Sequence, residues 1–184
     1  MNPKETIRAS KFLSLVLRHQ PETAGITLDS AGWADVDELL AGCGHARRSL
    51  TRQQLDHVVA TSEKKRYEFS SDGRRIRASQ GHSVEVDLEY EPLPPPDVLY
   101  HGTATRFLEA IRVEGLKKMA RHHVHLSAET SVTMQVSGRH GKPALLTIRA
   151  GDMHSAGWAF FRSTNGVWLV DAVPVEFIGF PLPP

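Results

Sequence analysis

Three short segments of the sequence concentrate side chains that bind anions or transfer protons. They are Arg18-His19, Arg77-Ala-Ser-Gln-Gly-His-Ser83 and Arg121-His-His-Val-His-Leu-Ser127. Arginine stays charged at physiological pH and can make paired hydrogen bonds to phosphate oxygens, whereas histidine gains or loses its proton near neutral pH. Arginines with neighbouring histidines therefore predict chemistry on phosphoryl groups. A hydrolase would instead be expected to show carboxylates.

The first two segments also have structural interpretations. Arg18 and His19 follow an apolar stripe, and a pair of cations there would favour the C-terminal end of a helix. The second segment can be explained as a polar strand end with a turn at Gly81. Ligand binding accounts better for its density of hydrogen-bond donors. These donors come from four side chains: Arg77, Gln80, His82 and Ser83.

The third segment raises the question of a metal site. Strand alternation places His123 and His125 on one face and His122 on the other. A metal site would need further ligands, and no carboxylate or thiolate lies nearby in the sequence to supply them. We therefore expect Arg121 and its neighbours to bind an anion or orient a substrate, without a metal.

The elements that position these side chains differ between the two halves of the chain. The first half predicts helices over residues 7–17, 36–42 and 51–59, followed by a hairpin that turns at Asp72-Gly73. Helices followed by a basic hairpin are typical of a winged helix, a common nucleic-acid-binding fold. The first half is therefore expected to be a winged-helix lobe.

The second half is richer in predicted strands. Strands are expected over residues 98–101, 124–127 and 144–149, with a helix over 106–116 and a hairpin at Asn165-Gly166. This mixture predicts the α+β class. The chain contains neither a Gly-x-Gly-x-x-Gly turn after a strand nor a Walker-type lysine loop, which disfavours a Rossmann dehydrogenase and a P-loop NTPase.

A proline-rich stretch separates the halves. Three consecutive prolines in residues 91–97 favour an extended spacer. We expect one domain over residues 1–90, a linker over 91–97 and a second domain over 98–184.

Charge is distributed unevenly along the 184 residues, although the net charge is only +1. Residues 1–83 carry a net +3 and residues 84–184 a net −2. The cations of the first half form three clusters, which mark either a solvated face or a polyanion-binding surface. They are Arg47, Arg48 and Arg52; Lys64, Lys65 and Arg66; and Arg74, Arg75 and Arg77.

The remaining composition indicates a globular, reduced protein. Hydrophobic residues make up 40% of the chain, and Cys43 is the single cysteine, which excludes an internal disulfide and a cysteine-cluster zinc site. The polar N-terminus shows no signal peptide, and no apolar run is long enough to cross a bilayer. We expect a cytoplasmic protein that does not associate with membranes.

Six motifs occur in order over about residues 8–180, and together they resemble the NAD-dependent RNA (tRNA) 2'-phosphotransferase family. Single motifs of this length are weak signals, but six in the same order are highly specific. They are Ser10-Lys-Phe-Leu-Ser-Leu-Val-Leu-Arg-His-Gln-Pro-Glu, Gly32-Trp-Ala-Asp-Val-Asp-Glu-Leu-Leu, Ile76-Arg-Ala-Ser-Gln-Gly-His-Ser, Leu99-Tyr-His-Gly-Thr, Arg121-His-His-Val-His-Leu-Ser and Phe161-Arg-Ser-Thr-Asn-Gly-Val-Trp-Leu.

The resemblance implies a winged-helix lobe for RNA and an ADP-ribosyltransferase-like lobe for NAD. The family's essential Arg-His-Arg-Arg set is carried over to Arg18, His19, Arg77 and Arg121. The NAD-binding positions are carried over to His101, Gly102, Thr103, His125 and Ser127. Gln80, His82 and Ser83 are expected to bind the RNA substrate.

The implied activity transfers an internal 2'-phosphate from tRNA-like RNA to NAD, which acts as a co-substrate, with no metal and no obligate protein partner. The expected products are 2'-hydroxyl RNA, ADP-ribose 1'',2''-cyclic phosphate and nicotinamide, formed through a 2'-phospho-ADP-ribosylated RNA. Two alternatives stay open. One is a winged-helix regulator that binds nucleic acid. The other is an ADP-ribosyltransferase that modifies nucleic-acid ends or protein.

Overall fold

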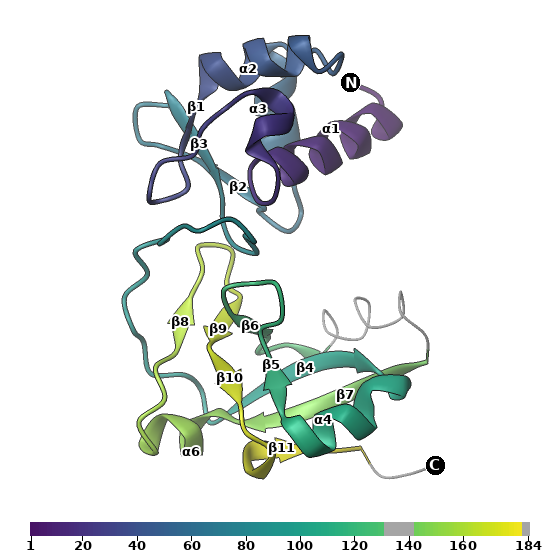
Figure 1. The fold of residues 1–184 in the computed structure, drawn as a ribbon, viewed down its shortest axis with the longest axis vertical. Helices are drawn as coiled ribbons and strands as arrows, with labels where there is room; N and C mark the ends of the chain where they lie inside the picture. Colours follow the sequence, from purple (N-terminus) through teal and green to yellow (C-terminus); the bar gives the residue numbers. More distant parts are fainter. Residues whose placement is uncertain (131–141, 182–184) are drawn as a thin grey trace. The chain divides into compact units, whose positions relative to one another are not determined.

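A computed structural model describes residues 1–130 and 142–181 of the chain. The chain forms two compact units, Met1–Glu89 and Tyr90–Pro184 (Figure 1). Both units combine helices with antiparallel sheets, which confirms the predicted α+β class. No helix in the described part of the chain is long and apolar enough to span a membrane.

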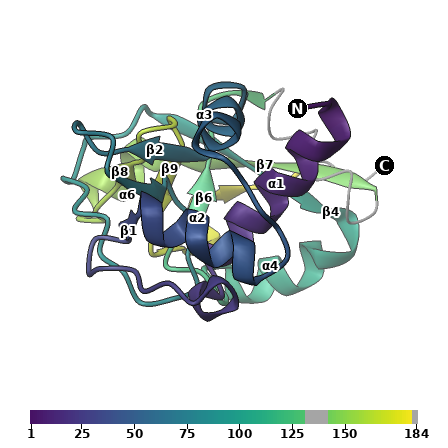
Figure 2. The ribbon, with the colours of Figure 1, turned by 90° about the horizontal axis from the view of Figure 1, so that it is seen from above.

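The first unit packs three helices against a small antiparallel sheet, and Figures 1 and 2 show the helices grouped together. The sheet has the strand order β1-β3-β2, in which Asp35 pairs with Arg75 and Glu68 with Arg77. The elements are α1 (Pro3–Val16), η1 (Pro21–Ala24), β1 (Ala34–Asp35), α2 (Val36–His45), α3 (Arg52–Ala60), β2 (Tyr67–Phe69) and β3 (Arg75–Ala78).

Helix α1 begins four residues before the predicted start. Asn2 caps it, because its side chain accepts a hydrogen bond from the Glu5 backbone while the Glu5 side chain accepts one from the Asn2 backbone. Pro3 suits the first helical position, where no backbone donor is needed. The sequence from Asn2 to Glu5 already contained this capping box and the proline at the first helical position. The apolar stripe predicted only residues 7–17. Ile7 itself is 57% exposed and does not belong to the buried face of the helix.

Helix α2 does not end at Gly42, as the sequence predicted, but continues to His45. Gly42 lies within the helix at a close packing contact. A Cβ at this position would lie 1.9 Å from the Ala24 carbonyl oxygen, so no larger residue fits without moving the backbone of η1. The glycine marks the approach of two backbones rather than a helix end.

The remaining local predictions for the first unit are confirmed. Thr51 and Gln54 form the predicted capping box of α3. Strands β2 and β3 pair on either side of a turn in which Gly73 adopts a φ of 69°, a left-handed conformation that favours glycine. Leu13, Leu39 and Ile76 are fully buried in the core between the helices and the sheet.

The second unit contains two three-stranded antiparallel sheets, β11-β7-β4 and β6-β9-β8, and a short pair, β10-β5. The buried apolar residues of these strands form one core with those of α4 and α6. The elements are β4 (Val98–Ala104), η2 (Thr105–Phe107), α4 (Leu108–Glu114), β5 (Leu116–Lys117), β6 (Val124–Leu126), β7 (Pro143–Arg149), α6 (Ala150–Ser155), β8 (Phe161–Arg162), β9 (Trp168–Val170), β10 (Ala172–Val173), η4 (Val175–Phe177) and β11 (Ile178–Gly179).

The predicted helix over residues 106–116 is shorter in the structure. Helix α4 ends at Glu114, and Leu116 belongs to β5, which pairs with β10. Gly115 ends the helix with a φ of 72°, and a Cβ there would lie 2.3 Å from the Val173 carbonyl oxygen. The hairpin at Asn165-Gly166 is confirmed between β8 and β9, with a φ of 82° at Gly166.

The proline-rich stretch makes contacts within the second unit. Pro92 forms an isolated antiparallel bridge with Phe161, and the Leu93 amide donates to the Phe160 carbonyl oxygen at 2.8 Å. Further along, the Gly151 amide donates to the Asp97 carbonyl oxygen at 3.0 Å. These bonds fix the path of the extended stretch along β8 and up to α6.

Candidate functional site

The first unit brings two of the three predicted segments together. The Arg18 carbonyl, at the end of α1, accepts hydrogen bonds from the Ser83 amide at 2.9 Å and the Val84 amide at 3.4 Å. His19 Nδ1 lies 2.9 Å from Ser83 Oγ. His19 is exposed, and Ser83 orients one of its ring nitrogens. We call Arg18, His19 and Ser83 the helix-end cluster.

Arg66 adjoins the helix-end cluster, although the sequence analysis gave it no separate role. Its carbonyl oxygen accepts hydrogen bonds from Arg18 Nη2 at 3.4 Å and from the Ser79 amide at 2.9 Å. The sequence showed Arg66 as part of the cation cluster at residues 64–66. Only the fold shows that this cluster, directly before β2, lies near Arg18. The structure therefore places a further arginine next to Arg18.

Tyr67 ties β2 to α1 beside this pair of arginines. Its hydroxyl donates to the Ser10 carbonyl oxygen and lies 2.7 Å from Ser14 Oγ. Since a hydroxyl has one proton to donate, the Ser14 hydroxyl is the donor in the second bond. Tyr67 is 4% exposed, so these hydrogen bonds are shielded from water. They hold the residue next to Arg66 against α1, the helix that precedes Arg18.

Arg77 has an environment that the sequence did not predict. Its side chain is 11% exposed, its Nε donates to Glu68 Oε1 at 2.6 Å, and its guanidinium stacks on the Trp33 ring at 4.4 Å. Nη1 also donates to the carbonyl oxygens of Ala31 at 3.3 Å and Leu88 at 3.5 Å. A phosphate bound by Arg77 would have to compete with Glu68 and these carbonyls.

Other predicted residues of the second segment shape the loop after β3. Gly81 adopts a φ of 86°, which turns the chain. His82 is 2% exposed, and its Nε2 lies 3.4 Å from the place that a Cβ would take on Gly32. Gln80 is partly exposed. Burial of His82 fixes the loop that carries Ser83 to His19.

The second unit connects three predicted residues in a row. His101 Nδ1, on β4, lies 2.9 Å from the His125 carbonyl oxygen, on β6. His125 Nδ1 in turn lies 3.4 Å from Arg121 Nη1. The structure therefore brings the His101 side chain to the backbone of His125, 24 residues further along the chain. We call His101, Arg121 and His125 the strand cluster.

The surroundings of His101 favour its neutral form. Burial lowers the pKa of His101 below its ordinary value of 6.5, and the positive charge of Arg121 lowers it further, against an opposing effect of the hydrogen bond to the His125 carbonyl. A carbonyl oxygen only accepts, so Nδ1 carries the proton. The Nε2 atom is then a lone-pair acceptor, suited to a hydroxyl donor.

Gly102, Thr103 and Ser127 continue the backbone around the strand cluster. Gly102 pairs with Leu145 and Thr103 with Ala144 across β4 and β7. The Ser127 and Tyr100 backbones exchange two hydrogen bonds of 2.8 and 2.9 Å, which joins the end of β6 to β4. Ser127 Oγ also accepts a hydrogen bond from the Glu129 amide at 3.0 Å.

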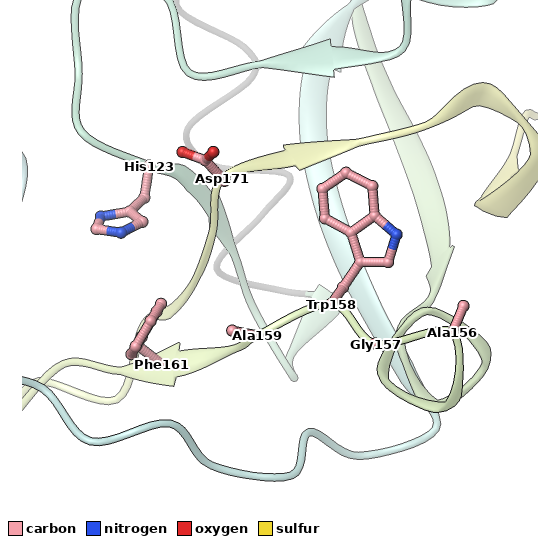
Figure 3. A pocket seen from close by; sticks show the side chains of 7 residues that line it. All are labelled: His123, Ala156, Gly157, Trp158, Ala159, Phe161 and Asp171. Atoms are coloured by element: carbon pink, nitrogen blue, oxygen red, sulfur yellow. The ribbon is translucent and has the colours of Figure 1, made fainter.

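A pocket of ≈ 480 Å³ adjoins the β6-β9-β8 sheet and is drawn in Figure 3. Rings and small side chains form most of its lining, with one carboxylate. The lining residues are His123, Ala156, Gly157, Trp158, Ala159, Phe161 and Asp171. Over residues 1–130 and 142–181, no three histidine, cysteine, aspartate or glutamate side chains gather in a way that could hold a metal ion.

Comparisons with known proteins identify the family. Residues 4–172 match the model of the RNA 2'-phosphotransferase, Tpt1 / KptA family. The chain belongs to the RNA 2'-phosphotransferase family. It is 54% identical over 179 residues to a probable RNA 2'-phosphotransferase of Pseudomonas aeruginosa, covering 97% of this chain and 98% of the relative.

Two further relatives have the same extent. A probable RNA 2'-phosphotransferase of Nostoc punctiforme is 51% identical over 178 residues, with 97% and 98% of the two chains covered. An RNA 2'-phosphotransferase of Escherichia coli is 52% identical over 178 residues, with 96% and 97% covered. The family resemblance read from the sequence is thereby confirmed, and membership implies a transferase that removes a 2'-phosphate from RNA.

Family membership gives the two clusters a chemical context. A 2'-phosphate on RNA is a dianionic group flanked by a phosphodiester, so an RNA 2'-phosphotransferase needs fixed cations and a group that moves protons. The helix-end cluster offers Arg18 and His19, with Arg66 next to them. The strand cluster offers Arg121 beside two histidines, one of them neutral.

Proposed function

We propose that this RNA 2'-phosphotransferase uses NAD as its phosphate acceptor and works without a metal. The products are then 2'-hydroxyl RNA, ADP-ribose 1'',2''-cyclic phosphate and nicotinamide. The strand cluster is the observation that carries this proposal. A neutral His101 with a free acceptor position suits a ribose hydroxyl, and Arg121 beside it suits the phosphates of a dinucleotide.

In the first step, an oxygen of the RNA 2'-phosphate attacks the anomeric carbon of the nicotinamide ribose. A phosphate oxygen–carbon bond forms, and the carbon–nitrogen bond breaks with its electron pair passing to the pyridinium ring. Nicotinamide leaves neutral, and a 2'-phospho-ADP-ribosylated RNA remains. The nucleophile is already an anion, so this step needs positioning of two polyanions rather than a strong base.

In the second step, the ribose 2''-hydroxyl attacks the shared phosphorus and the bond to the RNA 2'-oxygen breaks. One hydroxyl loses a proton and another gains one. We assign this transfer to His19, which is exposed and oriented through Ser83. General acid–base help of this kind is typically worth about 10²–10⁴-fold.

The arginines would stabilise the charge that develops on the phosphoryl oxygens. We assign Arg18 to the RNA phosphate and include Arg66, because its backbone is held against the Arg18 guanidinium. Arg121 would bind either the RNA phosphate or the NAD pyrophosphate. Arg77 stays a predicted phosphate ligand, although its bond to Glu68 favours a role in holding β2, β3 and the loop that follows.

The two units fit this division of labour. The first unit, with three helices and a β2–β3 hairpin, supports a winged-helix lobe that binds RNA. The second unit, with two antiparallel sheets and the strand cluster, supports an ADP-ribosyltransferase-like lobe that binds NAD. Gly102, Thr103 and Ser127 lie on the strands around His101 and are the proposed NAD contacts.

The test is to incubate the protein with a short RNA carrying one internal 2'-phosphate, with and without NAD, in the presence of EDTA, and to identify the products by mass. We expect 2'-hydroxyl RNA, the cyclic phosphate of ADP-ribose and nicotinamide only when NAD is added. Release of inorganic phosphate without NAD would contradict the proposal. ADP-ribose that stays attached to the RNA or to protein would instead support an ADP-ribosyltransferase.

A further inference from the structure

Phe161, which lines the pocket of Figure 3, lies on the same face of the β6-β9-β8 sheet as His125, the partner of Arg121. Cross-strand neighbours point to the same face, and the register pairs His125 with Leu169 and Leu169 with Phe161. His123 directly precedes β6, and its ring lies 5.6 Å from the ring of Phe161, which shares this face. The pocket therefore opens next to a side chain that we assign to phosphate binding.

The lining of this pocket suits a flat ring. The rings of His123 and Phe161 lie 5.6 Å apart at an angle of 57°, and Figure 3 shows the Trp158 side chain at the other side of the pocket. Figure 3 shows Ala159 between Phe161 and Trp158, and the other two lining residues without rings or charges, Ala156 and Gly157, are small as well. Aromatic side chains arranged in this way stack on the bases of single-stranded nucleic acid.

The charge of the pocket disfavours a phosphate and favours a hydrogen-bond donor. Among the described residues that line it, none is a lysine or an arginine, and Asp171 supplies a carboxylate. Asp171 pairs with Lys118 at 2.7 Å, but it is 70% exposed and keeps acceptor capacity. A carboxylate accepts a hydrogen bond from the exocyclic amine of cytosine or adenine, which uracil lacks.

We propose that this pocket binds the base of a nucleotide next to the one that carries the 2'-phosphate, and that it prefers bases with an exocyclic amine over uracil. The inference rests on the proposed function, because Arg121 must lie at a phosphate of the bound substrate. His123, Trp158 and Phe161 stack on the base, and Asp171 reads its amine edge. The pocket thus makes the transferase sensitive to the sequence around the modification.

The first test compares short 2'-phosphorylated RNAs that differ only in the neighbouring residue on the 5' or the 3' side: adenosine, cytidine, uridine or an abasic site. On one side, we expect the abasic residue to lower kcat/KM about 10-fold relative to adenosine, with uridine between them. Equal kcat/KM values for all neighbours on both sides would overturn the proposal.

Variants separate base stacking from a structural role. Phe161→Ala and Trp158→Ala should each lower kcat/KM about 10-fold for the adenosine substrate and leave the abasic substrate unaffected. Equal losses on both substrates would overturn the proposal. Phe107→Ala removes a ring of 42% exposure that is absent from the pocket lining, and it serves as the matched control with no effect on the ratio of the two substrates.

Asp171→Asn tests the reading of the base edge. The amide keeps an acceptor and gains a donor that can bond the carbonyl oxygen of uracil, so the preference for cytidine over uridine should fall about 5-fold. Lys118→Gln breaks the same ion pair but leaves the carboxylate, and should retain the preference. An unchanged preference in Asp171→Asn would contradict the assigned role.

A binding measurement distinguishes failure of this inference from failure of the proposed function. RNA with 2-aminopurine at the neighbouring position should lose fluorescence when it binds the protein without NAD, and Phe161→Ala should abolish the loss. Quenching in a protein that lacks NAD-dependent activity would support the pocket and refute the function. Activity without any quenching or base preference would refute the pocket alone.

Discussion

The two clusters hold their histidines in different ways. His19 is exposed at the end of a helix and shares a hydrogen bond with a hydroxyl that can donate or accept. His101 is partly buried between strands and bonded to a carbonyl that can only accept. The Ser83 hydroxyl can bond Nδ1 of His19 as donor or acceptor, whereas the His125 carbonyl bonds only a protonated Nδ1, and burial lowers the pKa of His101 and favours its neutral form. In the sequence His19 follows Arg18, whereas His101 lies between Tyr100 and Gly102, and the structure shows that the two rings are bonded to different kinds of partner.

The largest effect is expected from removing His19, to which we assign the proton transfer. His19→Ala should slow the second step about 10²–10⁴-fold and leave nicotinamide release much less affected, because the first step needs no proton transfer. Single-turnover reactions should then accumulate 2'-phospho-ADP-ribosylated RNA, detected by mass. Arg121→Ala should give the same intermediate to a smaller degree. If both variants stall before nicotinamide release, the assignment of steps is wrong.

Arg66 and Arg77 provide a second contrast, within one unit. Arg66→Gln should lower kcat about 10²–10³-fold, as expected for loss of one donor to a developing charge. Arg77→Met should cost about 2 kcal/mol in the free energy of unfolding, because it leaves Glu68 without its partner in a pair that is 11% and 24% exposed.

The double variant Arg77→Met with Glu68→Met distinguishes the roles of Arg77. If Arg77 acts only by holding the sheet, removing both charges should restore stability and most of the activity. Stability restored without activity would support the predicted phosphate contact. Urea unfolding and single-turnover rates provide the two measurements.

Removing the fixed acceptor should affect binding more than chemistry. His101→Phe keeps a ring of similar size but loses Nε2, so KM for NAD should rise about 10-fold while kcat changes less. Leu145→Ala, on the strand that pairs with β4, serves as a control for packing changes near the site. A fall in kcat with an unchanged KM would contradict a role in ribose binding.

Ser83→Ala should have a smaller effect on the helix-end cluster. Loss of the hydroxyl leaves His19 in place but removes the group that orients its ring, so kcat should fall about 5-fold. Ser83→Thr retains a hydroxyl and should recover most of the rate. A loss in Ser83→Ala as large as that in His19→Ala would mean that the serine itself contacts the substrate.

The smallest expected effect is on stability at mildly acidic pH. The pKa of His101 is lowered in the folded protein, so the unfolded chain binds a proton more readily than the folded chain once the pH falls below about 6.5. This group therefore lowers the free energy of unfolding as the pH drops from 7 toward 5. The pH dependence should be weaker in His101→Phe, as measured by urea unfolding, and an unchanged slope would contradict the buried neutral state.

Local signals in the sequence predicted much of the fold. The capping box at Thr51 and Gln54 and the turns at Gly73 and Gly166 depend on neighbouring residues, and each is found where it was expected. Glycines that serve long-range packing were misread. Gly42 looks like a helix end in the sequence, but it accommodates the Ala24 carbonyl, which is distant along the chain.

The candidate site shows the same limit. Motif resemblance selected His19, Ser83, His101, Arg121 and His125, and the structure groups them into two clusters. Motifs do not show which arginine forms an ion pair with another side chain of the protein. Arg77 proved to be bonded to Glu68, a pairing set by the register of β2 and β3. The motifs also did not identify Arg66, because its contact with Arg18 depends on how a strand packs on a helix.

The hydrogen bonds of the Tyr67 hydroxyl to Ser10 and Ser14 have an evolutionary consequence. Losing the tyrosine would leave two partly buried polar partners on α1 without this hydrogen bond, and losing either serine would leave the hydroxyl incompletely satisfied. Substitutions at positions 10, 14 and 67 should therefore covary across relatives, with an apolar side chain at 67 accompanied by small apolar residues on the helix. Descendants of this lineage can replace the three together, but a stepwise route passes through a less fit intermediate.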